Sequence, residues 1–228
     1  MSAKAEAPFW ANWFEGKSFT SDLSSVHFAR WDSVLRHRRN DPMRILEIGS
    51  WEGRSAVFFA QYFPNGSVTC IDTFAGGPVE HYGAMVDEIA QVESRFDANT
   101  KDYGVRVTKV KSTSISGLGK LQSEERTFDL IYIDGDHRRD IVLAESLLVW
   151  PLLTDDGILI WDDYKAGRQL PMAERVRQGV DIFLLLHAGE FEELARGSQM
   201  IVRKHGRPER DWRQEASLLS RVARNMFR

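Results

Sequence analysis

Residues 44–55 read RILEIGSWEGRS, in which an apolar run leads into a turn that contains Gly49 and Gly53. This order is typical of a buried parallel strand that passes directly into a helix. Glycines at the turn allow the backbone to approach a ligand more closely than a residue with a Cβ atom would. The nicotinamide fingerprint requires glycines at offsets zero, two and five. Counted from Gly49, those offsets fall on Trp51 and Arg54, so the sequence excludes that fingerprint.

Strand and helix patterns alternate outward from this stretch. Candidate strands are residues 44–49, 67–72, 105–110, 128–134, 157–162 and 199–204, with a weaker one at 191–195. Candidate helices are residues 54–63, 84–97, 115–122, 139–150, 171–186 and 211–226. The alternation predicts an α/β fold, a Rossmann-like open and mostly parallel seven-stranded sheet with helices on both faces. Ligands bind such sheets beyond the carboxyl ends of the strands, so we expect the functional residues in the loops there.

The length of 228 residues fits one full-sized domain with additions at its ends. We divide it into an N-terminal helical and aromatic cover segment (1–40), a central domain (41–205) and a basic amphipathic C-terminal helix (206–228). The aromatic cluster of the cover segment fits packing against the domain, a substrate lid or a contact between copies of the chain. The sequence therefore leaves open whether the chain forms a homodimer or a higher homo-oligomer.

The composition is ordinary for a soluble protein, with 43% hydrophobic and 28% charged residues. No apolar run approaches the roughly 20 residues that span a bilayer, and the N-terminus lacks the apolar core of a signal peptide. We therefore expect a cytoplasmic protein that does not bind membranes. Cys70 is the only cysteine, which excludes an intrachain disulfide and a cysteine metal cluster.

Residues 203–228 hold eight Lys and Arg against three acids. A basic tail can bind nucleic acid, but its apolar residues recur at helical spacing, which favours a packed or partner-facing helix. The sequence IWDDY also differs from the Asn/Asp-Pro-Pro-aromatic motif, which is typical of enzymes that methylate amino groups, and this argues against methylation of nucleic acid. We therefore expect no nucleic-acid partner.

The pattern Glu47-x-Gly49-x-x-x-Gly53-x-Ser55 resembles the first motif of class I S-adenosylmethionine-dependent methyltransferases. It looks closest to the branch around catechol O-methyltransferase and the metal-dependent macrolide-sugar O-methyltransferases, over about residues 40–205. The resemblance implies that the central domain binds S-adenosylmethionine. Gly49, Gly53 and the helix N-terminus would contact its methionine carboxylate, Ser55 would add a hydroxyl, and Glu47 would face its amino end.

Four further residues match the donor site of this family. Asp72 ends the second strand, where a carboxylate accepts both ribose hydroxyls; capping of a loop is the alternative. Thr113 and Ser114 follow the third strand, where the family binds the adenine edge, with simple helix capping as the alternative. Asp134, at the end of the fourth strand, is also expected beside the cofactor.

Acids cluster in the segments FDLIYIDGDHRRD (128–140) and GILIWDDY (157–164). If these strands adjoin in a parallel sheet, Asp134, Asp162 and Asp163 meet at one edge and raise each other's pKa. A divalent cation relieves that repulsion, and oxygen ligands suit Mg²⁺. The three aspartates match the metal-binding positions of the metal-dependent O-methyltransferases. Loop capping is the alternative for Asp162 and Asp163.

His137 follows Asp134 by three residues, an offset that carries the catalytic base in this branch. The ordinary pKa of histidine, near 6.5, suits proton transfer at neutral pH, and Asp134 would assist it. A structural histidine at a helix start is the alternative, and Lys165 and His81 are reserve candidates for the base.

Together these residues predict a Mg²⁺-dependent O-methyltransferase that acts on a small molecule with vicinal hydroxyls, of sugar, catechol or polyketide type. Three alternatives stay open. One is a metal-independent small-molecule methyltransferase, and another is a non-methylating relative linked to antibiotic hydroxylation, since fold does not fix function. The third is a non-catalytic binding module.

Overall fold

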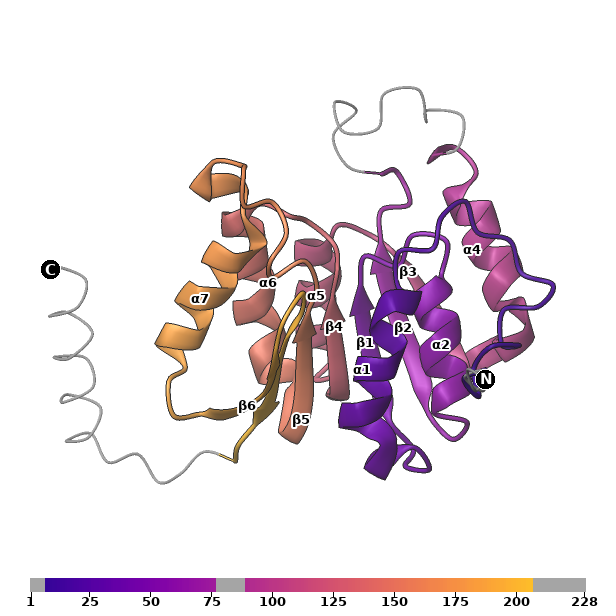
Figure 1. Cartoon of the computed structure of the whole chain (residues 1–228), viewed down its shortest axis with the longest axis horizontal. Coiled ribbons are helices and arrows are strands. Elements are labelled where there is room, and N and C mark those ends of the chain that lie inside the picture. The colour runs from indigo at the N-terminus through magenta and orange to yellow at the C-terminus, as the bar shows by residue number, and fades with distance from the viewer. Residues whose placement is uncertain (1–6, 77–88, 207–228) are drawn as a thin grey trace, which may run out of the picture.

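The computed structural model describes residues 7–76 and 89–206. Its centre is a single sheet of seven strands in the order β3-β2-β1-β4-β5-β7-β6 (Figure 1). The strands are β1 (Arg44–Ile48), β2 (Ser67–Asp72), β3 (Val107–Lys111), β4 (Phe128–Ile133), β5 (Leu153–Trp161), β6 (Phe191–Arg196) and β7 (Met200–Lys204). Strands β1 to β5 are parallel, and β7 is antiparallel to both of its neighbours. The predicted mostly parallel α/β fold is confirmed.

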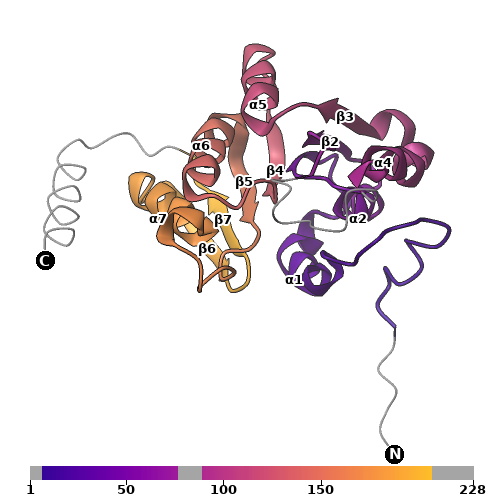
Figure 2. The ribbon, with the colours of Figure 1, turned by 90° about the horizontal axis from the view of Figure 1, so that it is seen from above.

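Helices cover both faces of the sheet (Figure 2). The main helices of the described part are α1 (Ser25–Leu35), α2 (Arg54–Tyr62), α4 (Val92–Thr100), α5 (Ser114–Ser123), α6 (Arg139–Val149) and α7 (Val176–Leu186). One core contains side chains of α1, α2 and α4, and the other contains side chains of α5, α6 and α7. Because both faces are covered, a central strand such as β1 is apolar along most of its length.

Some predicted boundaries were wrong. Strand β5 begins at Leu153, whereas the prediction placed its start at residue 157. The first half was missed because the exposed residues Asp155 and Asp156 look like a turn in the sequence. Pro171 lies before a short 3-10 turn, and α7 begins only at Val176. Helix α4 begins at Val92, and the earlier part of the predicted helix 84–97 lies largely outside the described residues. The predicted helix 211–226 and His81 also lie outside them.

The N-terminal segment packs on the domain. Phe28 and Trp31 of α1 are fully buried in the same core as α2. Ahead of α1, the Trp13 ring lies 5.6 Å from that of Phe58 and the Trp10 ring 6.2 Å from it. The aromatic cluster is therefore in contact with the domain, as the first of its three interpretations expected.

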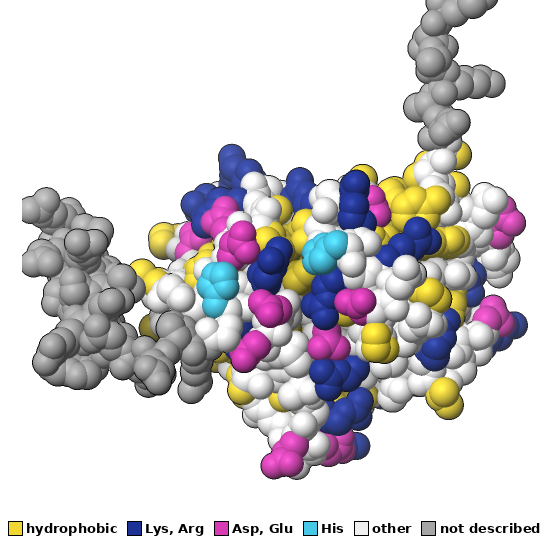
Figure 3. All heavy atoms as spheres, turned by 90° about the horizontal axis from the view of Figure 1, so that it is seen from below, with side chains coloured by type: hydrophobic (Ala, Val, Ile, Leu, Met, Phe, Trp, Pro, Cys, Tyr) yellow, Lys and Arg dark blue, Asp and Glu magenta, His cyan; other side chains and the backbone are white. Residues whose placement is uncertain are grey.

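The amino ends of the parallel strands lie at the edge of the sheet opposite to the loops that carry the candidate site. Figure 3 shows this edge, on which basic and acidic side chains are interspersed rather than gathered into a patch of one sign. Within the described residues, no helix is long and apolar enough to cross a bilayer.

Candidate active site

The turn after β1 depends on two glycines with left-handed backbone angles. Gly49 and Gly53 both have φ of +83°, a region that residues with a Cβ atom rarely adopt. A Cβ atom on Gly49 would lie 2.1 Å from the backbone oxygen of Asp134. One on Gly53 would lie 3.0 Å from the ring of Phe96. The glycines therefore let the turn pack against the β4 loop and α4. The sequence predicted only a close approach to a ligand and did not predict this packing role.

Asp72, at the end of β2, holds the same turn. Its Oδ2 accepts hydrogen bonds from the backbone N–H groups of Ser50 (2.7 Å) and Trp51 (2.8 Å), and its Oδ1 accepts one from Phe74 (2.6 Å). The carboxylate thus organises the loop, which is the alternative role considered for it. A carboxylate oxygen accepts up to two hydrogen bonds, so Oδ1 retains capacity for a ribose hydroxyl.

Glu47 is a buried acid beneath the turn. Its side chain is fully buried, and neither carboxylate oxygen makes a hydrogen bond with a described residue. Burial raises the pKa of Glu47 to about 7, and the nearby hydroxyls of Ser55 and Ser50 offset part of that increase. A buried carboxyl without a partner is costly. The amino group of a methionine moiety would supply the missing partner, so the residues present fit S-adenosylmethionine.

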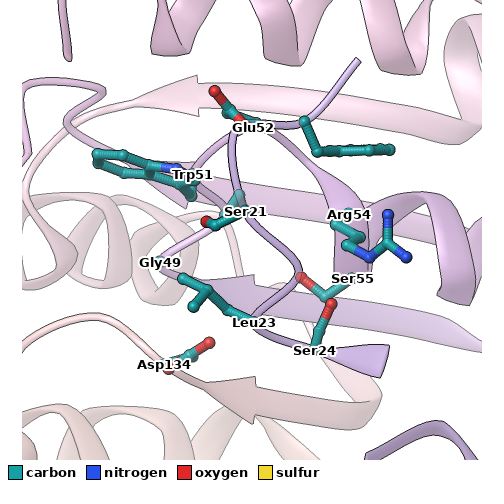
Figure 4. A pocket seen from close by; sticks show the side chains of 11 residues that line it. Ser21, Leu23, Ser24, Gly49, Trp51, Glu52, Arg54, Ser55 and Asp134 are labelled. Carbon is teal, nitrogen blue, oxygen red and sulfur yellow. The ribbon is translucent and has the colours of Figure 1, made fainter. Parts of the chain in front are cut away.

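A small hollow of about 50 Å³ lies over this turn (Figure 4). It is lined from the turn and α2 by Gly49, Ser50, Trp51, Glu52, Arg54 and Ser55, from the β4 loop by Asp134, and from the N-terminal segment by Phe19, Ser21, Leu23 and Ser24. The backbone N–H and the hydroxyl of Thr20 donate to the two carboxylate oxygens of Glu52, at 2.6 and 3.0 Å. The N-terminal segment is thereby fixed across the donor turn.

The predicted adenine edge contains a helix cap and a second buried acid. Thr113 caps α5, since its hydroxyl accepts from the N–H of Ser116 at 3.4 Å. Ser114 begins α5 and lies near Glu145, a fully buried residue of α6. Burial raises the pKa of Glu145 to about 7, and the Ser114 hydroxyl offsets part of this increase. Capping is thus seen for Thr113, whereas a role of either residue in binding adenine stays a prediction.

Asp134, His137 and Asp163 come together at the carboxyl edge of β4 and β5. One ligand atom of each lies within 4.8 Å of the others, which makes them a candidate cation site. Nε2 of His137 lies 2.8 Å from Oδ2 of Asp163. That contact, together with the charge of Asp163, raises the pKa of His137 above its ordinary value. Asp136 instead accepts from the N–H of Arg138 just before α6.

Asp162 is turned inward from this group. Its Oδ2 accepts from the hydroxyl of Tyr132 and from Nε2 of Gln199, the latter at 3.2 Å. Its Oδ1 accepts from the N–H of Asp163 at 2.7 Å and lies 3.4 Å from Nε2 of His27. The structure therefore brings Asp134 and Asp163 together with His137, and holds Asp162 behind them.

Tyr132 connects Asp162 to Asp134. Its hydroxyl also contacts Oδ2 of Asp134 at 2.8 Å, so one proton is shared between two carboxylates. Desolvation, followed by the nearby charge of Asp162, raises the pKa of Asp134 well above its usual range. A divalent cation would relieve this crowding, and carboxylate oxygens are its preferred ligands. The donor set at this edge therefore fits a hard cation.

Comparison with known proteins identifies the family of the chain. A model described as "Methyltransferase domain" matches residues 46–164, more than half of the chain. The chain belongs to this family. A curated relative, the uncharacterized protein R132 of Acanthamoeba polyphaga mimivirus, is 22% identical over 151 residues, which is 64% of this chain. The chain matches 62% of the length of that relative.

Solved methyltransferase structures share the fold. The O-methyltransferase of Bacillus cereus with bound SAH is 20% identical with a TM-score of 0.59, over 82% of this chain and 84% of that one. A putative caffeoyl-CoA O-methyltransferase of Staphylococcus aureus is 17% identical with a TM-score of 0.58, over 82% and 86%. MycE from the mycinamycin pathway, with Mg, SAH and mycinamycin VI, is 17% identical with a TM-score of 0.57, over 83% and 54%. The predicted methyltransferase is confirmed at the level of family and fold.

Proposed function

We propose that the chain is an S-adenosylmethionine-dependent and divalent-cation-dependent O-methyltransferase for a small molecule with vicinal hydroxyls. The observation that supports this most directly is the position of Asp134. Its side chain lines the hollow over the donor turn and also belongs to the group with His137 and Asp163. A donor and an acceptor bound at these two places would therefore meet at one residue.

The residues divide the work as follows. When bound, S-adenosylmethionine supplies an electrophilic methyl group, and a divalent cation lowers the pKa of a hydroxyl that it binds. Asp134 and Asp163 would hold the cation, with Asp162 as the third acid behind them. His137 would take the proton of the acceptor hydroxyl at Nδ1, because Nε2 donates to Oδ2 of Asp163. The glycine turn and Asp72 hold the donor, and positioning of the two reactants accounts for much of the rate.

The cation site can be tested by removing one ligand. Asp163→Asn should weaken Mg²⁺ binding about tenfold or more, because an amide replaces a charged oxygen ligand. Calorimetry on the full chain measures this, with Asp155→Asn as a control that makes the same charge change at the exposed start of β5. Turnover should disappear in excess EDTA and return with added Mg²⁺. Full turnover in EDTA would favour the metal-independent alternative.

The donor site can be tested at Asp72. Asp72→Ala should raise the Kd for S-adenosylmethionine about tenfold or more, since hydrogen bonds to a charged group contribute about 1.5–3 kcal/mol each. The urea midpoint should also fall, because three backbone N–H groups lose their acceptor. Asp155→Ala, which removes a carboxylate from the exposed start of β5, should change neither value. Unchanged affinity in Asp72→Ala would remove this residue from the donor site.

A further inference from the structure

The loop from β5 to α7 forms a second hollow on the functional edge. It begins with Tyr164, directly after Asp163, and measures about 430 Å³. The buried hydroxyl of Tyr164 donates to Oδ1 of Asp181 at 2.6 Å and accepts from Nη1 of Arg196 at 2.8 Å. These bonds attach the start of the loop to α7 and β6. The hollow therefore has an anchored wall next to the candidate cation site.

The lining of this hollow is strongly basic. It contains four cations and one carboxylate: Lys165, Arg168, Arg175, Arg177 and Asp181. The carboxylate is already engaged, because Arg177 donates to its Oδ2 at 3.1 Å and Tyr164 to its Oδ1. Nε of Arg175 donates only to a backbone oxygen, that of Leu170, at 2.7 Å.

The charges of Lys165 and Arg168 are uncompensated. Neither side chain makes a hydrogen bond or an ion pair with any residue of the described part. Lys165 and Arg168 are exposed, so water and salt screen their repulsion in part, but together with Arg175 they leave three cations without a carboxylate partner in the described part, which attracts an anion to the hollow. Guanidinium groups match the oxygens of a phosphate in geometry, and a lysine adds a point charge. A phosphate ester carries about −1.5 to −2 charges at neutral pH, against −1 for a carboxylate, and so fits this excess better.

We infer that this hollow binds a phosphate group on the acceptor, so that the substrate is a phosphorylated small molecule with vicinal hydroxyls. The inference rests on the proposed function, since the hydroxyls would lie at Asp134, His137 and Asp163. The phosphate would lie past Tyr164, among Lys165 and Arg168. The hollow then selects the substrate by charge, while the acids and His137 act on its hydroxyls.

Inorganic phosphate is the probe that tests this, by calorimetry on the full chain at constant ionic strength. The wild type should bind phosphate, and Lys165→Gln/Arg168→Gln should weaken that binding roughly tenfold or more, since two charge-assisted contacts are lost. The control Lys101→Gln/Arg126→Gln removes the same charge from exposed positions after α4 and before β4, and should stay within twofold. Acetate should bind more weakly than phosphate to the wild type.

Three results would overturn the inference: no saturable phosphate binding by the wild type, equal weakening in the control, or acetate that binds as tightly as phosphate. Calorimetry with S-adenosylmethionine on the same samples separates the two proposals. Normal binding of S-adenosylmethionine without phosphate binding would defeat this inference alone. Phosphate binding without binding of S-adenosylmethionine would defeat the proposed function, and with it the assignment of the phosphate to an acceptor.

Discussion

His137→Ala should lower turnover by about 10²–10⁴-fold, the range that general acid–base catalysis contributes. The ring of His137 lies at the edge where Asp134 and Asp163 meet, with Nε2 2.8 Å from Oδ2 of Asp163. Removal of the ring leaves the acceptor hydroxyl without a nearby base. Binding of S-adenosylmethionine should be unchanged, because the glycine turn and Asp72 do not depend on this residue. Steady-state kinetics and calorimetry measure the two effects separately.

A second histidine provides the matched control. His187 lies at the end of α7, where Nδ1 is 3.0 Å from Oε2 of Glu190. His187→Ala should leave turnover within about twofold, since it lies away from the proposed catalytic group. Near wild-type turnover in His137→Ala would shift the role of base to Lys165, His81 or a carboxylate. A loss of folded structure in that variant, seen by circular dichroism, would instead favour a structural histidine.

The pH profile gives an independent readout of His137. The residue accepts a proton only when its ring is neutral, so turnover should rise with pH as the ring loses its proton. Contact with Asp163 raises the pKa of His137 above the ordinary 6.5. We therefore expect the rise on the alkaline side of that value in the wild type. The rise should be absent from the residual activity of His137→Ala.

The sequence predicted the strands well because their signals are local. Both faces of the sheet are covered, so β1, β2, β4 and β5 appear as apolar runs, and acids such as Asp134 mark their carboxyl ends. Boundaries failed where local signals mislead. Asp155 and Asp156 resemble a turn but lie within β5, at an irregularity where the register with β4 shifts from Phe128–Leu153 to Leu130–Ile158 and where Asp156 has φ of +60°.

The roles of individual acids depended on contacts that no local pattern shows. Asp162 was expected to hold the cation with Asp134 and Asp163, and its role as a ligand stays a prediction; the sequence did not show that Tyr132 of β4 and Gln199, just before β7, bind one of its oxygens. The basic hollow was missed because its cations gather through the folding of a long loop against α7. Glu145 could have been found, since it is an acid on the apolar face of α6.

Gly49→Ala should destabilise the fold by about 2–5 kcal/mol, the sum of about 1–2 kcal/mol for a left-handed residue and about 1–3 kcal/mol for overpacking. The second contribution arises because the new Cβ atom would lie 2.1 Å from the backbone oxygen of Asp134. That atom belongs to the β4 loop and not to a flexible side chain, so the strain cannot be relieved by a rotamer change. The free energy of unfolding in urea measures the loss.

Gly16→Ala separates the two contributions. Gly16 has φ of +74°, but its added Cβ atom would have no atom within 4 Å. This variant should lose only about 1–2 kcal/mol, the cost of the left-handed backbone. Equal losses in the two variants would show that close packing between the donor turn and the β4 loop contributes nothing. A larger loss in Gly49→Ala, accompanied by weaker Mg²⁺ binding, would show that this packing also positions Asp134, and hence that the donor turn and the cation site are built as one unit.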